Sequence, residues 1–215
     1  MKAQIWNPVT AERMNIALQD NGQTSTADLH LEANESAFIV FSNEQETGLT
    51  DYSPTEKETL LTIDTPWKVD FQKGMRGPDE TYVMTELQTW DQNEDERIRY
   101  FSGTATYTNT FKLKKQPDQP VWIDLGRVMV MARVYVNNQY AGGVWTSPYR
   151  LNIQHLLHKG TNTLRVEVVN NWQNRLIGDQ KLPENERPTW TSVNPWRADS
   201  PLQESGLVGP VRLLQ

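Results

Sequence analysis

The chain has 215 residues, 37% of them hydrophobic, and its mean hydropathy of -0.67 marks it as polar for its size. Lys and Arg number 21 against 27 Asp and Glu, and the resulting net charge of -6 argues against nonspecific binding to nucleic acid or to an anionic membrane surface. The absence of cysteine excludes disulfides, thiolate zinc sites and cysteine nucleophiles, and no apolar run approaches the roughly 18 residues of a membrane-spanning helix.

The first 58 residues are expected to form a short β-hairpin segment followed by a linker. Two apolar runs, Ala27–Leu31 and Ser36–Phe41, predict the strands of the hairpin, and Trp6–Thr10 is typical of a turn. Residues 43–58 are polar and rich in turn-forming residues, as in a linker. Two strands and a linker are too few to bury an independent core, so we expect residues 1–58 to pack on the remainder of the chain or to end a preceding domain.

Residues 59–215 are predicted to form an all-β domain, an antiparallel β-sandwich, because short alternating strands there are separated by turn signals. The predicted strands cover residues 60–63, 67–71, 104–113, 121–125, 132–136, 163–169 and 211–214. A strand or a short loop element is expected at 81–87, and one helical turn at 153–157.

Alternation within these strands predicts which side chains face the core. The expected inward residues are Ala105, Tyr107, Phe111, Leu113, Val121, Ile123, Leu125, Ala132, Val134, Val136, Leu164, Val166 and Val168. Asn109 interrupts the apolar face of its strand, and the polar stretch 91–99 is expected to be a solvated loop.

Several segments resemble the sugar-binding jelly roll of glycoside hydrolase family 2 and its relatives. These segments are Arg99–Phe111, Trp122–Val128, Ala132–Asn138 and Gly142–Tyr149. Two more, Asn171–Asp179 and Ser205–Val211, are similar to the C-terminal portion of bacterial α-L-rhamnosidases of the large multidomain type. Trp6–Pro8 and Glu35–Phe41 are similar to the segment that precedes that domain.

The resemblance implies a galactose-binding-like jelly roll that serves as a non-catalytic accessory domain of a glycosidase. Its partner would be the catalytic domain of the parent enzyme, with a bound glycan as a second partner, and its location would be extracytoplasmic, periplasmic or secreted, in a bacterium. Residues 1–6 lack the apolar stretch of a signal peptide, so the start could be a boundary cut from a longer protein. Two alternatives stay open: a stand-alone carbohydrate-binding module, and a purely structural domain without a ligand.

Catalytic and metal sites have little support in the residues. A glycosidase needs two carboxyl groups about 5–10 Å apart in environments that separate their pKa values. The available carboxylates, which surface solubility explains, are Glu86, Asp91, Glu94, Asp95 and Glu96. His155 and His158 are only two potential ligands, His30 is far away in sequence, and Ser205-Gly-Leu-Val-Gly lacks the spacing of a serine nucleophile. We expect no catalytic residue, metal or cofactor; acidic loops could hold a structural calcium ion, but no spacing points to one.

The segment 170–179 is the leading binding candidate, because it follows a strand and so lies at an end of the sandwich where loops cluster. The candidate carbohydrate-binding residues are Asn171, Trp172, Asn174, Arg175 and Asp179. The asparagines supply the donors and acceptors that sugar hydroxyls require, and Trp172 offers a stacking face. The alternative, favoured by the internal bonding needs of buried polar loops, is that Arg175 pairs with Asp179 to order the loop while Trp172 plugs a packing gap.

Eight tryptophans are many for this length, and we expect most to be structural, with one to three available to a ligand. Trp145 and Tyr149 flank a proline turn, which in the family that the chain resembles borders a ligand cleft or packs on the neighbouring domain, and we favour the packing role for both. Trp190 and Trp196 lie in the irregular stretch 189–197, which suits a domain interface and a glycan surface equally.

Overall fold

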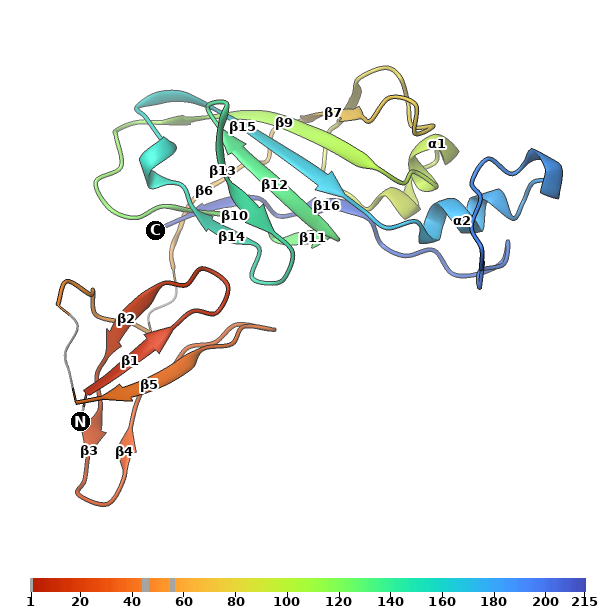
Figure 1. Cartoon of the computed structure of the whole chain (residues 1–215). Helices are drawn as coiled ribbons and strands as arrows, with labels where there is room; N and C mark the ends of the chain where they lie inside the picture. The colour runs from red at the N-terminus through yellow and green to blue at the C-terminus, as the bar shows by residue number, and fades with distance from the viewer. Residues whose placement is uncertain (1, 44–46, 55–56) are drawn as a thin grey trace. The chain divides into compact units, whose positions relative to one another are not determined.

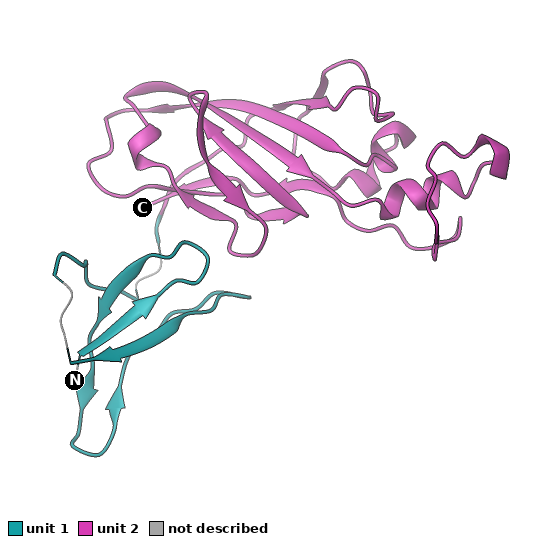
Figure 2. Ribbon diagram, in the orientation of Figure 1, with its two compact units in different colours: residues 1–58 teal, residues 59–215 magenta. Residues whose placement is uncertain are grey.

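The structure is a computed structural model that describes residues 2–43, 47–54 and 57–215. The chain divides into two compact units, residues 1–58 and 59–215, which are coloured separately in Figure 2. Of the linker expected over 43–58, residues 44–46 and 55–56 lie outside the described residues.

Unit 1 is a small sheet with a small core. Its strands are β1 (Lys2–Trp6), β2 (Arg13–Ile16), β3 (Gln19–Asp20), β4 (Ser25–Thr26) and β5 (Phe38–Ser42). The sheet order is β2-β1-β5, and β3 pairs with β4 as a separate ribbon. Ala3, Ile5 and Ile16 are the buried residues of the core, and Met14 and Ile39 are among the half-buried side chains that pack against them.

The hairpin predicted in this unit is wrong. Ala27–Leu31 forms no strand, and Leu29 and Leu31 remain 43% and 46% exposed. The backbone of His30 bonds instead to the Tyr52 hydroxyl, which receives the His30 N–H at 3.0 Å and donates to the His30 carbonyl at 3.1 Å. The second predicted strand exists as β5, but it pairs with β1. Strand β1 was not predicted, because three consecutive residues of this strand are buried and it therefore shows no alternation.

Unit 2 is an antiparallel β-sandwich, as predicted (Figure 1). The larger sheet has the order β13-β12-β15-β9-β7-β8 and the smaller sheet the order β14-β10-β17-β6, while β11 pairs with β16. The strands of the larger sheet are β7 (Trp67–Phe71), β8 (Tyr82–Met84), β9 (Thr104–Leu113), β12 (Met131–Val136), β13 (Gln139–Val144) and β15 (Gly160–Val169). The others are β6 (Thr59–Thr62), β10 (Trp122–Asp124), β11 (Arg127–Met129), β14 (Arg150–Asn152), β16 (Gly206–Gly209) and β17 (Arg212–Leu214).

The inward residues predicted from alternation are buried in one continuous core, which confirms that part of the prediction. Along β9 the buried positions alternate without a break, because Asn109 is buried as well. Its amide donates to the Thr65 carbonyl at 3.0 Å and its Oδ1 accepts from the Thr65 hydroxyl at 2.9 Å, so the polar group is satisfied inside the core.

Short helices cap the sandwich: η1 (Trp90–Gln92), α1 (Glu96–Arg99), η2 (Gln154–Leu156), α2 (Gln173–Asp179) and η3 (Glu184–Glu186). The helical turn expected at 153–157 appears as η2. Residues 91–99 are not the expected solvated loop, because Ile98 is fully buried and Asp91 and Asn93 are only 9% and 6% exposed. Among the described residues, no helix is long and apolar enough to cross a membrane.

Candidate functional site

The candidate segment begins where β15 ends, and hydrogen bonds join it to residues 101–103, which directly precede the neighbouring strand β9. Asn170 accepts from the Gly103 N–H at 3.0 Å and donates to the Phe101 carbonyl at 2.8 Å. The Ser102 hydroxyl donates to the Asn171 carbonyl at 2.8 Å. These bonds fix the direction in which the chain leaves the sheet, so the next segment starts from a defined position.

Residues 173–179, expected as a loop, form the helix α2. Tertiary packing explains this helix better than local sequence does, since seven residues are too few for a stable isolated helix. Ile177 is 1% exposed, and a Cβ on Gly178 would lie 2.7 Å from Cγ of Tyr100. In Figure 1, α2 and α1 lie at the same end of unit 2.

The two candidate asparagines mainly bond within the protein. Asn174 is 2% exposed; its Oδ1 accepts from the Gln203 N–H at 2.8 Å, and its Nδ2 donates to the Gln203 carbonyl at 2.7 Å. Asn171 donates to Gln203 Oε1 at 2.6 Å, and its Oδ1 accepts from the Gln173 N–H at 3.1 Å. Asn174 therefore positions α2 against residues 203–205 and has no group left for a ligand. Asn171 is exposed, but its side chain already makes hydrogen bonds within the protein.

Arg175 and Asp179 do not form the pair considered from the sequence. Arg175 donates from Nη2 to the Met75 carbonyl at 2.9 Å, and Asp179 accepts from the Thr189 N–H at 3.1 Å. No ion pair joins the two side chains in the part of the chain that the structure describes. The two residues instead hold two different segments, around Met75 and around Thr189, against α2.

These segments line an open cavity of about 240 Å³. It is lined by Gly74, Met75, Arg76, Ser102, Trp172, Arg175, Pro188, Thr189 and Trp190, and we call it the Arg175 hollow. Trp172 is 50% exposed and Trp190 is 87% exposed, so both indole rings are accessible to a ligand. The hollow brings together residues from both tryptophan-containing segments that were singled out from the sequence, and adds residues 74–76, which were not.

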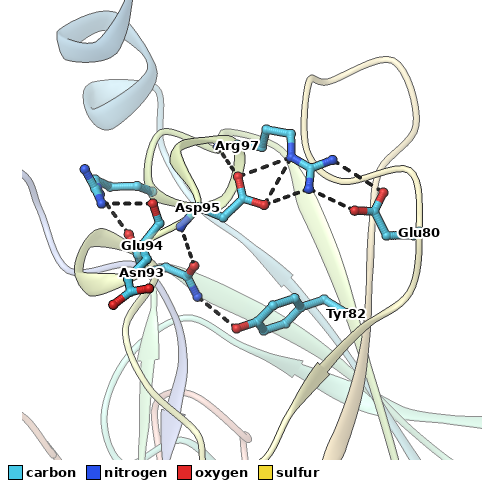
Figure 3. A network of polar contacts seen from close by, with 7 residues as sticks. Glu80, Tyr82, Asn93, Glu94, Asp95 and Arg97 are labelled. Atoms are coloured by element: carbon cyan, nitrogen blue, oxygen red, sulfur yellow. Dashed lines mark hydrogen bonds and ion pairs between the residues drawn. The ribbon is translucent and has the colours of Figure 1, made fainter.

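The loop that carries residues 74–76 is held by contacts of the residues that follow them. A Cβ on Gly77 would lie 2.7 Å from Cβ of Phe71 and 2.8 Å from the Phe101 ring, so the backbone there packs directly on the core. Farther along, Arg97 bonds to Glu80 and to Asp95, each at 2.8 Å (Figure 3). The bonds from Arg97 lower the pKa of both carboxyl groups below their usual values.

The remaining candidates lie outside the hollow. Trp145 is 59% exposed, so its packing on a neighbouring domain stays a prediction, whereas Tyr149 is half-buried and packs against the core of this unit. Trp196 is half-buried, and its backbone N–H donates to Oδ1 of Asn194 at 3.0 Å. The described residues contain no group of three or more His, Asp or Glu side chains arranged to hold a metal ion.

Comparison with known proteins bears on the role of this sandwich. Residues 83–201 match the family described as glycosyl hydrolase 2 galactose-binding domain-like. A putative beta-glucuronidase from Formosa agariphila is 36% identical over 154 residues, which are 60% of this chain and 13% of that protein.

Solved structures show the same arrangement of strands. The rhamnosidase from Novosphingobium sp. PP1Y superposes with a TM-score of 0.86 at 37% identity, covering 99% of this chain and 20% of that one. A β-glucuronidase from Ruminococcus gnavus gives a TM-score of 0.53 at 18% identity over 74% of this chain and 29% of its own, which shows the fold alone. The chain thus spans a fifth or less of the rhamnosidase and of the Formosa protein.

Proposed function

Since the chain belongs to the glycosyl hydrolase 2 galactose-binding domain-like family, we propose that it is a non-catalytic accessory sandwich of a longer, rhamnosidase-like glycoside hydrolase and that it holds a glycan in the Arg175 hollow. The chemistry of hydrolysis would reside in a separate catalytic domain of that enzyme. The likeness of nearly the whole chain to one fifth of a rhamnosidase supports this division of labour.

The observation that carries the glycan-binding proposal is the pairing of two accessible tryptophans with polar groups in one cavity. The faces of a sugar ring present C–H groups, which pack on aromatic rings, and the ring edges present hydroxyls, which need hydrogen-bond partners. Trp172 and Trp190 provide the aromatic surface, while Ser102, Thr189 and Arg175 line the same cavity with polar groups. Binding sites of this kind combine apolar walls with a few placed polar groups.

Titration of the chain with a panel of rhamnosides and galactosides tests this proposal. Saturable changes in the indole signals of Trp172 and Trp190, lost in Trp172→Ala and Trp190→Ala but kept in Trp145→Ala, are the expected result. Trp145 is a matched control because it is similarly exposed and lies outside the hollow. A domain with a purely structural role would respond to no sugar, and turnover of an aryl rhamnoside by this chain alone would overturn the non-catalytic assignment.

A second role, packing against the catalytic domain, is favoured by apolar side chains that each unit leaves exposed. Phe38 and Phe41 of β5 are 60% and 53% exposed, and Val193 of unit 2 is 73% exposed. Contact with another protein would remove these apolar side chains from water, which is favourable in proportion to the apolar area buried. Copurification of this chain with the separately expressed remainder of its parent enzyme tests the role; a Phe38→Ser, Phe41→Ser variant should copurify less, and equal recovery would count against it.

A further inference from the structure

The Arg175 hollow is locally basic in a chain that is acidic overall. Its nine lining residues include two arginines, Arg76 and Arg175, and no aspartate or glutamate. The chain as a whole carries a formal net charge of -6. In a concave site the local arrangement of charge, rather than the net charge, decides which ions accumulate.

Arg175 keeps much of its hydrogen-bonding capacity unused. The residue is 8% exposed, and one of its nitrogens donates to the Met75 carbonyl at 2.9 Å. A guanidinium carries several N–H donors in a planar fork. Within the described residues Arg175 makes no other hydrogen bond. None of its nitrogens lacks both solvent and a partner, so the unbonded nitrogens reach solvent. The residue lines the hollow, so an anion bound there would lie within reach of donors that are not already bonded to the protein.

The charges around Arg175 would favour the binding of an anion beside it. Burial lowers the pKa of this guanidinium, and repulsion by Arg76 acts in the same direction, while Asp179 opposes both. The Asp179 carboxylate already accepts from the Thr189 N–H and forms no ion pair with Arg175 among the described residues. A partly buried cation gains from a close counterion with good geometry.

Arg76 faces the same cavity from a fixed loop. Its φ of 64° is uncommon for a residue with a side chain, and Gly74 nearby has a φ of 77°. The tight packing of Gly77 on Phe71 and Phe101 holds this loop against the core. Arg76 is exposed and, in the described part of the chain, has no acidic partner, so its charge is available to a ligand.

We propose that the Arg175 hollow selects sugars that carry an anionic substituent, either the carboxylate of a uronic acid or a sulfate ester, held between Arg76 and Arg175 while the sugar ring packs on Trp172 or Trp190. This inference rests on the proposed glycan-binding function and adds the charge of the ligand to it. Both substituents present oxygen pairs that match the guanidinium fork, so the shared chemistry is an oxyanion on a pyranose ring.

Three ligands that differ only at C6 test the proposal: methyl β-D-glucoside, its uronic acid and its 6-sulfate. We expect the chain to bind at least one acidic ligand about threefold or more tightly than the neutral glucoside, as measured by calorimetry and by indole N–H shifts. The preference should shrink as salt is raised, because the charges are partly screened. The acidic ligand with the higher affinity identifies the substituent as carboxylate or sulfate.

Two variants connect any preference to the hollow. Arg76→Gln should reduce the acidic-to-neutral preference towards one, and Arg175→Lys should weaken acidic ligands by removing the planar fork. Arg133→Gln is the matched control, because Arg133 is an exposed arginine of β12 that lies outside the hollow and its loss changes the net charge equally. Thermal unfolding of each variant separates lost binding from lost folding.

The outcomes are distinguishable. Equal binding of neutral and acidic ligands at Trp172 and Trp190 would overturn the charge selection and leave the glycan-binding function standing. An acidic preference that persists in both Arg76→Gln and Arg175→Lys would also overturn it. The absence of any response to these three ligands and to neutral rhamnosides and galactosides would overturn both proposals.

Discussion

Replacement of Asp124 by alanine should destabilise unit 2 strongly. Asp124 lies on β10 directly opposite Arg150 of β14 and Arg212 of β17, so one carboxylate serves three adjacent strands of the smaller sheet. Its Oδ2 accepts from Arg150 at 3.0 Å and from Arg212 at 3.3 Å, and its Oδ1 accepts from the Gly126 N–H at 2.8 Å. The Asp124 side chain is 5% exposed, whereas those of Arg150 and Arg212 are 19% and 35% exposed.

The size of the effect depends on this burial. Removing one partner of a fully buried ion pair costs about 3–5 kcal/mol, mostly because the other charge is left without its counterion. Arg212 reaches solvent and Arg150 has further contacts, so we expect the low end for Asp124→Ala, about 3 kcal/mol. At this chain length that corresponds to a melting temperature lower by about 6–12 °C. Asp124→Asn keeps an acceptor for Gly126 and loses the charge, so its cost should be smaller.

Urea unfolding monitored by tryptophan fluorescence measures the loss, since Trp67 and Trp90 are buried in the core of unit 2. Asp118→Ala is the matched control: its side chain is 73% exposed beside Lys115 at 3.7 Å, and such a surface pair contributes at most about 1 kcal/mol. If Asp124→Ala costs no more than the control, the carboxylate does not hold the three strands together and the reasoning fails.

Three further changes have expected outcomes. Gly126→Ala should destabilise the sandwich by about 2–4 kcal/mol in urea unfolding, because the φ of Gly126 is 65° and a Cβ would lie 2.3 Å from the Gly209 backbone. Gly160→Ala is the control and should cost less, because no atom lies within 4 Å of the added Cβ. Asn174→Ala removes the bonds to Gln203 and should cost about 2 kcal/mol while weakening any ligand of the hollow; unchanged stability would argue against its positioning role. Arg97 lowers the pKa values of Glu80 and Asp95 below their usual 4.5 and 3.8. Its bonds to the two carboxylates therefore stabilise the fold at a pH above these usual values, and the stabilisation is lost as the pH falls through the lowered pKa values. The difference in melting temperature between the wild type and Arg97→Gln should therefore shrink in acid, and a difference independent of pH would contradict the assignment.

The long strands of unit 2 were predictable because each has two different faces. In β9 and β15 every second residue is buried, and β12 and β7 repeat the pattern, so period-two alternation identified both the strands and their inward residues. Unit 1 lacked this signal: its strand β1 has consecutive buried residues, and the described part of its core holds three buried hydrophobic side chains.

The site was predictable in part. Trp172, Arg175 and Trp190 were identified from their loops, but nothing local indicated that they share a cavity with residues 74–76. The bond between Arg175 and Met75 joins residues 100 positions apart, a distance over which single-sequence patterns carry no information. Helix α2 was missed for the same reason, since burial of Ile177 and contact of Gly178 with Tyr100 stabilise it rather than any capping signal.

The central claim is that the Arg175 hollow is a glycan site on a non-catalytic sandwich. Its most direct test is the titration of the 215-residue chain with neutral and acidic glycosides, with the indole N–H resonances of Trp172, Trp190 and Trp145 monitored separately. We expect saturable shifts at Trp172 and Trp190 and none at Trp145. Shifts confined to Trp145, or none at any indole with any sugar, would contradict the claim.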